Sequence, residues 1–298
     1  MPPAPAPLPR QWAIKESDVE IGRLIAQGGF GQVLEGMWLG HTKVAVKRLL
    51  IKPGRDVMSD IEREVTAWSA LRHPNVLPFF GACVEAPLPW MISPFMERGN
   101  VLHYLSTFED GPGDDLRLSL IYDISKGMQY LHSQKVIHSD LKSVNVLVSN
   151  DGAALVTDFG FVRVRSKTRS TLSKNMNVPG TFQWMPPERH RDGTCDEKGD
   201  VYAFAMMCVE IWTLDVPFGT IPDSPFLYHR IVNEGFRPDL SSIDMPEALK
   251  SLLRECWDQR PEARPTFSAI AERLKAIATR ECRIAPTRCC TRRRATSS

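Results

Sequence analysis

The sequence predicts an α+β protein with a small β-rich lobe followed by a larger helical lobe. Short β-type runs, separated by glycines or polar turns, fill the chain between residues 18 and 97. From residue 98 to residue 279 the apolar residues recur mostly at helical spacing. A chain of 298 residues is long enough to bury the core of one large domain or of two lobes. We expect disordered ends at residues 1–17, which are rich in proline, and at residues 280–298, which are basic.

The β-rich part begins with three strand-like runs. They read DVEIGRLIA, GQVLEGMWLG and TKVAVKRLL, with glycines or polar residues between them. Residues 57–72 then show a helical pattern, and residues 76–83 and 87–96 are strand-like again. The connection to the helical part is therefore expected near Pro94–Gly99.

The helical part contains one amphipathic stretch, one apolar stretch and three further helices. Residues 116–134 place Leu118, Ile121 and Ile124 at a spacing of three residues, which is typical of one helix face. Residues 200–214 are almost wholly apolar, which predicts a buried helix. The remaining predicted helices are residues 226–235, 245–259 and 266–280.

Composition excludes several classes of function. The net charge is +2, but the last nineteen residues hold six arginines and one glutamate, so the rest of the chain is slightly acidic. A slightly acidic body is not expected to bind nucleic acid. No apolar run is long enough to span a membrane, and the N-terminus lacks the pattern of a signal peptide. The seven scattered cysteines form no pair of Cys-x-x-Cys motifs, which argues against zinc and fits free thiols. We expect a cytoplasmic protein.

The stretch AQGGFGQV, residues 26–33, is the first candidate site. Its glycines let backbone amides approach an anion closely. No helix and no Lys-Ser/Thr pair follows, which excludes a P-loop, and the missing helix also excludes a dinucleotide-binding turn. Phe30 would cover the tip of the loop, and Val33 would rest on a planar ligand. The alternative is a plain glycine-rich hairpin turn.

Lys47 ends the apolar run VAVK at residues 44–47, one hairpin after the glycines. Such a hairpin would return its ammonium group beneath the glycine loop, where it would meet a phosphate. Glu62 or Glu64, on the helical stretch that follows, could position it. The alternative is an ordinary surface lysine.

The third candidate lies in KVIHSDLKSVNVLVSN, residues 135–150, where polar residues sit between two apolar runs. Asp140, Lys142 and Asn145 are too many polar groups for a simple turn between strands. Asp158 follows Asn145 by thirteen residues and precedes Phe-Gly. Asp and Asn oxygens are hard ligands that suit Mg²⁺. Each acid alone would more often be a turn residue or a helix cap.

Taken together, these motifs resemble those of a eukaryotic protein kinase catalytic domain, over residues 18 to 278. The stretches GGFGQV, RHPNVLPFFGAC and GTFQWMPPE are similar to Raf-type and mixed-lineage kinases of the tyrosine-kinase-like group. The other matching motifs are VAVK, HSDLKSVN, DFG at 158–160, PPE at 186–188, DVYAF at 200–204 and Arg264 in EARPTF. The resemblance implies a bilobal protein kinase fold.

The resemblance also implies which residues bind ATP. Lys47 would hold the α- and β-phosphates and pair with Glu64. Ser93 falls at the gatekeeper position, beside an adenine-binding hinge at Pro94–Met96. The residues that the resemblance assigns to the nucleotide are Ala26, Gly28, Gly29, Phe30, Gly31, Val33, Ala45, Lys47, Ser93, Phe95, Met96 and Leu147.

The same resemblance implies the catalytic roles. Asp140 would accept the proton of the substrate hydroxyl, while Asn145 and Asp158 would hold Mg²⁺. Lys142 would steady the γ-phosphate, and a lysine at this position implies Ser or Thr substrates. Glu188 and Arg264 would form a buried structural ion pair. Four aromatic rings would stack as a spine between the lobes: Trp68, Phe79, His138 and Phe159.

Three positions depart from the family pattern. Ala26 replaces the first loop glycine, and Pro186 replaces an alanine. Ser139 stands where most members have an arginine that pairs with a phosphorylated residue of the activation loop. We therefore expect activity that does not depend on that arginine–phosphate pair.

The sequence thus predicts a serine/threonine protein kinase that uses ATP and Mg²⁺ and acts on proteins, with regulatory protein partners open. The first alternative is a pseudokinase that acts as a nucleotide-binding scaffold or allosteric partner. Lys47, Asp140 and Asp158 are all present, which argues against it. A second alternative is a kinase for small molecules, but such enzymes generally lack the PPE-type motif. Tyrosine or dual specificity stays open.

Overall fold

The computed structural model describes residues 12–28, 31–49, 65–159, 182–219, 221 and 225–284. The chain divides into two compact units. The first unit contains the chain up to Gly99 and the segment that begins at Leu147, and the second contains Asn100–Val146 and the chain from Thr181 onward. The first unit is β-rich and the second is helical, so the predicted bilobal fold is confirmed.

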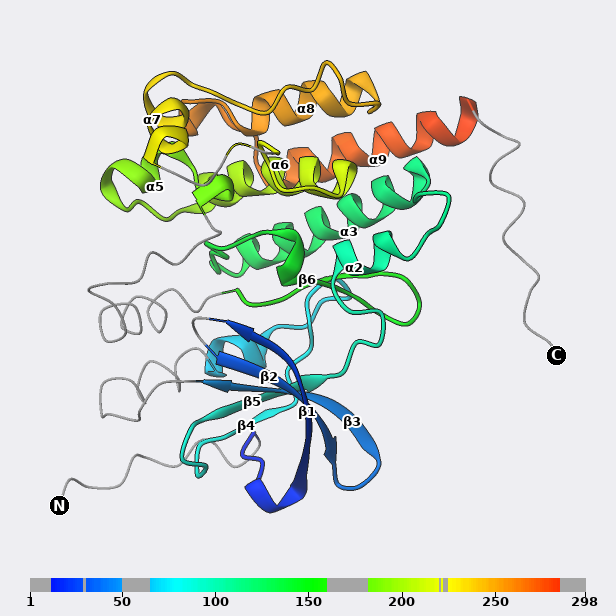
Figure 1. The fold of residues 1–298 in the computed structure, drawn as a ribbon, viewed down its shortest axis with the longest axis vertical. Helices are drawn as coiled ribbons and strands as arrows, with labels where there is room; N and C mark the ends of the chain where they lie inside the picture. The colour runs from blue at the N-terminus through cyan, green and yellow to red at the C-terminus, as the bar shows by residue number, and fades with distance from the viewer. Residues whose placement is uncertain are drawn as a thin grey trace. The chain divides into compact units, whose positions relative to one another are not determined.

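The first unit is built on an antiparallel sheet, whose described strands run in the order β1-β2-β3-β5-β4 (Figure 1). The first three strands are consecutive hairpins and coincide with the three predicted strand-like runs. Of the predicted strand at residues 76–83 only the end is a strand, because the amide of Leu77 bonds to β7 instead. The bounds are β1 Val19–Gly28, β2 Gly31–Trp38, β3 Thr42–Leu49, β4 Gly81–Cys83 and β5 Trp90–Pro94.

Buried and half-buried residues alternate along β3, which shows which face of the sheet is covered. Val44 and Val46 point to one face and are 0% exposed, while Ala45 and Lys47 point to the other face and are half-buried. The covered face forms the core of the unit, to which Val19, Trp90 and Ile92 also contribute. One face of the sheet therefore stabilises the unit by apolar burial, and the other is left for polar contacts.

The segment after Leu147 joins the first unit through backbone hydrogen bonds. The strands β6 (Val146–Val148) and β7 (Ala154–Val156) pair with each other. The amide of Leu77 donates to the carbonyl of Val156, and the amide of Val156 donates to the carbonyl of Asn75, both at 2.9 Å. This differs from the expected division at residue 97, because short strands such as β6 and β7 give no sequence signal of the partner they pair with.

Residues 12–17, which composition placed in the disordered N-terminal segment, are ordered. The amide of Ile14 donates to the carbonyl of Ala82 at 3.0 Å, and the amide of Ala82 donates to the carbonyl of Trp12 at 2.9 Å. The Ile14 side chain is 7% exposed. A Cβ atom on Gly81 would lie 2.7 Å from the carbonyl oxygen of Trp12, so glycine is required for this close approach. The described contacts thus begin at Trp12, whereas composition predicted a disordered segment up to residue 17.

The second unit is helical, and its five predicted helices are all present (Figure 1). The helix α9 ends at Ile284 and thus extends into the segment that we expected to be a disordered tail from residue 280. The short helices α2 and α5 were not predicted. The described α-helices are α2 Val101–Ser106, α3 Asp114–Ser133, α5 Pro187–Asp192, α6 Glu197–Thr213, α7 Pro225–Asn233, α8 Glu247–Cys256 and α9 Phe267–Ile284. Short 3₁₀ segments are Glu16–Asp18 in the first unit, and Ser143–Asn145, Phe182–Trp184 and Pro261–Ala263 in the second.

The centre of the second unit is α6, whose residues are buried from Asp200 to Trp212. The side chain of Asp196 caps its N-terminus by accepting a hydrogen bond from the amide of Gly199 at 2.8 Å. The helix stops at Leu214, which has a left-handed backbone with φ 56°. Cys208 is also buried, as its apolar context predicts. A helix that is apolar all round is therefore covered on all sides, as its sequence indicates.

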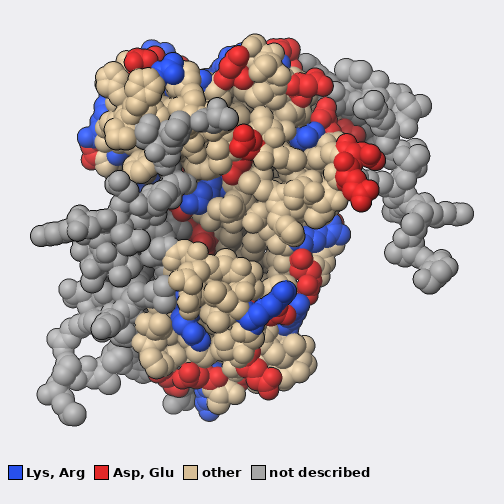
Figure 2. All heavy atoms as spheres, in the orientation of Figure 1, with Lys and Arg blue, Asp and Glu red and all other residues tan. Residues whose placement is uncertain are grey.

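The described surface carries both signs of charge. On the face in Figure 2, basic and acidic side chains of the described residues are mixed, with wide uncharged areas between them. None of the helices in the described part of the chain combines the length and the apolar character needed to cross a bilayer.

Candidate active site

The strand register of the first unit gathers the predicted nucleotide residues on one face of the sheet. Val33 on β2 pairs with Lys47 on β3, and Ala45 on β3 pairs with Ser93 on β5. Ala26 on β1 pairs with Val33 in turn. Directly paired residues, and residues two apart in a strand, point to the same face. This face is opposite the buried core face, and of these five residues only Ser93 is buried.

Of the glycine loop, the structure describes the two ends, Gly28 and Gly31. Gly28 ends β1 and pairs with Gly31, which begins β2. A Cβ atom at Gly31 would lie 2.5 Å from the carbonyl oxygen of Arg48, so only glycine fits there. Gly28 has open space around it. The predicted contacts of Gly29 and Phe30 lie outside the described residues.

The predicted hinge follows β5 directly. The ring of Phe95 lies under the ammonium group of Lys43, whose Nζ is 4.3 Å from the ring centroid. The amide of Gly99 donates to the carbonyl of Met96 at 3.0 Å, which turns the chain. Leu147, the last predicted nucleotide residue, is half-buried on β6 in the same unit.

Lys47 forms an ion pair with Asp158, which follows β7. The two residues are 111 positions apart, and the sheet and the β7 segment bring them together within the first unit. Asp158 has a left-handed backbone with φ 61°, a conformation that non-glycine residues rarely adopt and that gathers at functional sites. The expected partner Glu64, and Glu62, lie outside the described residues.

Three of the four predicted spine residues belong to the first unit, and they are in contact. The ring centroids of Trp68 and Phe79 are 4.9 Å apart, and those of Trp68 and Phe159 are 5.8 Å apart. The indole of Trp68 donates to the carbonyl of Leu77 at 2.9 Å. These contacts place the DFG segment on the aromatic core of its own unit. The fourth residue, His138, belongs to the second unit and is 0% exposed.

The second unit brings Asp140, Lys142 and Asn145 together. The Nζ of Lys142 is 3.4 Å from Asp140 Oδ2. The Nδ2 of Asn145 donates to the carbonyl oxygen of Asp140 at 2.7 Å and to its Oδ2 at 3.2 Å. The Asp140 side chain is 13% exposed. A carboxylate is thus held between a cation and an amide while part of it stays accessible to a reactant.

Asp200, at the start of α6, fixes the loop that carries these groups. Its Oδ2 accepts from the amide of His138 at 2.8 Å and lies 2.9 Å from Nε2 of His132. Its Oδ1 accepts from the amide of Ser139 at 2.7 Å. The carboxylate is 1% exposed, so charge-assisted bonds replace the water that it has lost.

Glu210, ten residues further along α6, fixes the other end of the loop. Its Oε2 accepts from the amide of Ser143 at 3.0 Å and from the indole of Trp184 at 2.9 Å. Burial raises the pKa of the Glu210 carboxyl, although these hydrogen bonds partly oppose the shift. The folded protein therefore holds a proton on Glu210 more tightly than the unfolded chain does.

Replacing Glu210 by glutamine is expected to remove a pH dependence of stability. Because its pKa is raised on folding, the wild type loses stability relative to Glu210→Gln as pH rises from about 4.3, the ordinary pKa of a glutamate. The loss ends above the raised pKa. Glutamine keeps an oxygen that can accept from Ser143 and Trp184. Denaturant unfolding of both proteins from pH 4 to pH 8 measures this difference, and parallel pH profiles would contradict it.

The predicted metal ligands fit Mg²⁺ by their chemistry. Asp158 offers a carboxylate, and Asn145 offers an amide oxygen, since both of its described side-chain bonds use the nitrogen. Among the described residues no cluster of three or more His, Cys, Asp or Glu side chains could hold a metal. The two oxygens belong to different units, and their role as ligands stays a prediction.

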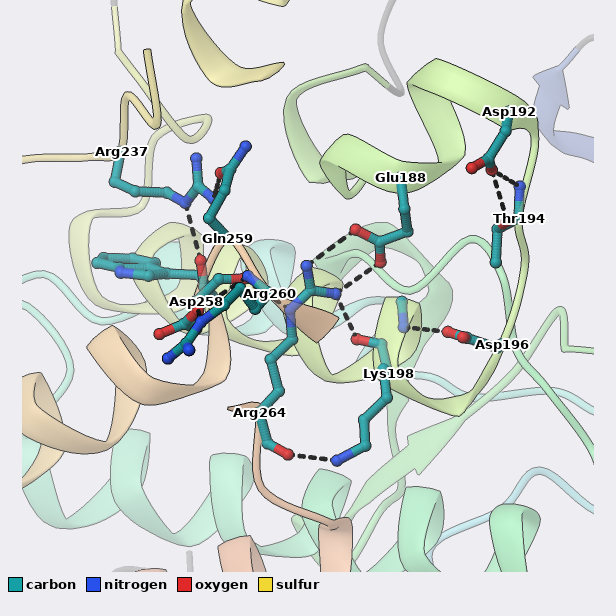
Figure 3. A network of polar contacts seen from close by, with 12 residues as sticks. Glu188, Asp192, Thr194, Asp196, Lys198, Arg237, Asp258, Gln259, Arg260 and Arg264 are labelled. Carbon is teal, nitrogen blue, oxygen red and sulfur yellow. Dashed lines mark hydrogen bonds and ion pairs between the residues drawn. The ribbon is translucent and has the colours of Figure 1, made fainter. Parts of the chain in front are cut away.

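The predicted ion pair between Glu188 and Arg264 is present and buried (Figure 3). The guanidinium binds both carboxylate oxygens, at 2.6 and 2.9 Å. It also donates to the carbonyls of Lys198 at 3.0 Å and Asp258 at 2.9 Å. The side chains are 0% and 5% exposed for Arg264 and Glu188. The pair joins α5 to the start of α6 and to the segment before α9.

Sequence reasoning missed the contacts that hold the loop with Asp140, Lys142 and Asn145. Asp200 was recognised only as part of a motif, and Glu210 and Arg189 were not singled out. The charge of Asp200 and Glu210 inside an otherwise apolar helix is the signal that could have found them, because buried charges are usually paired. No comparable signal marks Arg189, which lies 50 residues from its partner Ser139.

Comparison with known sequences identifies the family of the chain and several of its relatives. The profile of the family "Protein tyrosine and serine/threonine kinase" matches residues 19–274. The serine/threonine-protein kinase STY17 of Arabidopsis thaliana is 30% identical over 270 residues, covering 90% of this chain and 46% of STY17. The serine/threonine-protein kinase VIK of the same plant is 32% identical over 286 residues, covering 92% of this chain and 64% of VIK. The human tyrosine-protein kinase Srms is 31% identical over 282 residues, covering 92% of this chain and 55% of Srms.

The chain therefore spans between about half and two thirds of the length of these three relatives. The family match covers both units, from β1 to α9. It agrees with the kinase motifs that the sequence presents in order. The chain belongs to the protein tyrosine and serine/threonine kinase family.

Proposed function

We propose that the protein transfers the γ-phosphate of ATP to serine or threonine hydroxyls of other proteins. The observation that carries this proposal is the arrangement around Asp140, whose carboxylate is held by Lys142 and Asn145 on a loop fixed by Asp200. Phosphoryl transfer needs positioning and charge neutralisation more than covalent chemistry. A fixed carboxylate beside a lysine supplies an acceptor for the hydroxyl proton and a cation for the phosphate.

The residues of the first unit supply the other needs of the reaction. Lys47 is the cation for the α- and β-phosphates, and Asp158 keeps its ammonium group in place. Ala45, Val33 and Leu147 bind the adenine ring, with Phe95 and Met96 at the hinge. Asp158 and Asn145 would hold Mg²⁺, which would neutralise phosphate charge when bound. The protein part of the substrate is identified only as a hydroxyl donor.

Serine and threonine are favoured over tyrosine for two reasons. Lys142 stands two residues after Asp140, where the family resemblance implies serine or threonine substrates, and its Nζ is 3.4 Å from Asp140 Oδ2. STY17 and VIK are both named serine/threonine-protein kinases, although Srms is named a tyrosine-protein kinase. A pseudokinase is the alternative, and the intact set of Lys47, Asp140 and Asp158 argues against it. We also propose a cytoplasmic location and regulatory protein partners.

The first experiment follows phosphate transfer from labelled ATP with Mg²⁺, to the protein itself and to a generic basic protein. Wild type is expected to incorporate label on serine or threonine, as shown by phosphoamino-acid analysis. Lys47→Met removes the ammonium group that would bind the phosphates of ATP. It is expected to abolish incorporation while the protein stays folded. No incorporation by the wild type, with ATP binding still measurable, would instead identify a pseudokinase. Label on tyrosine would overturn the assigned specificity.

A further inference from the structure

Ser139, directly before Asp140, has an unusual backbone conformation. Ser139 has φ 65°, in the left-handed region that non-glycine residues rarely adopt. The next residue is Asp140, so the direction of the Ser139 peptide sets the direction in which the catalytic carboxylate leaves the backbone. Something must hold this conformation, and the Ser139 side chain does not. Its buried hydroxyl lies beside the thiol of Cys195, which is only a weak hydrogen-bond partner.

Two charged side chains hold the Ser139 backbone from opposite sides. Its amide donates to Asp200 Oδ1 at 2.7 Å. Its carbonyl oxygen accepts a hydrogen bond from Nη1 of Arg189. Asp200 comes from α6 and Arg189 from α5, so the bonds tie the loop to two different helices. Hydrogen bonds with an ionised partner are about twice as strong as neutral ones.

Within the part of the chain that the structure describes, Arg189 makes this bond without a competing ion pair. Among the described residues, no carboxylate lies within ion-pair distance of its guanidinium. The side chain is half-buried and lines a small cavity together with Ser139, Asp140 and Cys195. Its neighbour Arg191 on the same helix is exposed, which provides a matched comparison.

We propose that Arg189 is a positioning residue for phosphoryl transfer. By donating to the Ser139 carbonyl it fixes the peptide that carries Asp140, and thereby aims the catalytic carboxylate. The bond from Arg189 on α5 fixes the Ser139 carbonyl, as the bond from Asp200 on α6 fixes the Ser139 amide. This inference rests on the proposed kinase function, and it adds a contact that the catalytic residues themselves do not require.

The test compares Arg189→Ala, Arg189→Lys and Arg191→Ala with the wild type. For Arg189→Ala we expect kcat to fall about 10- to 100-fold, as loss of one charge-assisted bond in the reacting state would give. KM for ATP should stay within about twofold, because the nucleotide residues belong to the other unit. Arg189→Lys should recover part of the activity, and Arg191→Ala should retain all of it.

Chemical rescue separates positioning from a general structural role. Arg189→Ala would enlarge the cavity beside Ser139, and millimolar methylguanidinium could then restore the donor and raise kcat. Wild type and Arg191→Ala should not respond. Unchanged kcat in Arg189→Ala, or a loss that methylguanidinium and the lysine variant both fail to recover, would overturn the proposal.

Amide hydrogen exchange tests the same bond without any enzyme activity. The amide of Asp140 belongs to the peptide that Arg189 holds, so its exchange should be at least several-fold faster in Arg189→Ala than in Arg191→Ala. If the wild type transfers no phosphate, the kinase function fails while this measurement still decides the role of Arg189. Equal exchange in the two variants would overturn it.

Discussion

Glu188→Ala is expected to lower the free energy of unfolding by about 3–5 kcal/mol, because it leaves the Arg264 guanidinium buried without its counter-charge. Arg264 is 0% exposed and is held by two carboxylate oxygens and two carbonyls (Figure 3). Removing the carboxylate deletes the only described acidic partner of this cation. A loss of that size is a large part of the total stability of an ordinary domain.

The chain contains a matched control for this prediction. Glu255 and Arg273 form a second two-bond pair, at 2.5 and 2.9 Å, but their side chains are 48% and 38% exposed. Glu255→Ala should cost no more than about 1 kcal/mol, as exposed pairs usually do. Denaturant unfolding followed by circular dichroism at a helix wavelength compares the two, since all of these residues lie in the helical unit.

A third variant separates two causes of the lost stability, the unpaired charge of Arg264 and the loss of packing. Replacing both Glu188 and Arg264 by apolar residues of similar volume removes the lone cation and should recover much of the lost stability. If Glu188→Ala were no more harmful than Glu255→Ala, the buried pair would not have the structural role that we assign to it.

Asp140→Asn is expected to lower kcat for phosphate transfer by about 10²- to 10⁴-fold, the usual contribution of a positioned general base. Asparagine keeps the shape of the side chain and an oxygen that can accept from Asn145. It cannot take the hydroxyl proton, and it removes the negative charge beside Lys142. The affinity for ATP should change little, because the nucleotide residues belong to the first unit.

Steady-state kinetics and direct ATP binding measure the two quantities separately. Asp239→Asn is the matched control, because Asp239 lies in the same unit and only caps a turn by accepting from Ser241. That variant should keep the wild-type rate. A variant Asp140→Asn that retained more than a tenth of the wild-type kcat would contradict the role of Asp140 as base.

The elements that could be predicted are those with a long, regular pattern. The alternation of Val44, Ala45, Val46 and Lys47 reveals both the strand and its buried face. The apolar run of α6 likewise reveals a buried helix. By contrast, α2 has six residues and is capped by Asn100, whose side chain accepts from the amide of His103 at 2.9 Å. A single turn and a half carries too little periodicity to be recognised.

The candidate site divides in the same way. Lys47 and Ala45 could be placed on one face because they share a strand, and pairing of neighbouring hairpins puts Val33 on the same face. The partners of the catalytic loop could not, since Asp200, Glu210 and Arg189 reach it only through the tertiary fold. Sequence therefore predicts which groups do chemistry, whereas the orientation of these groups depends on residues 50 or more positions away.

The two attachments of the loop to α6 also fix its length. Asp200 binds the Ser139 amide and Glu210 binds the Ser143 amide, and these two acids are ten residues apart on one rigid helix. Ten helical residues rise about 15 Å. The four peptide units from Ser139 to Ser143 reach about 14 Å when fully extended. A deletion in this stretch would leave one amide out of reach, and an insertion would bulge Asp140 or Lys142 out of place. The number of residues between the two attachments is thus limited by the length of α6 between Asp200 and Glu210.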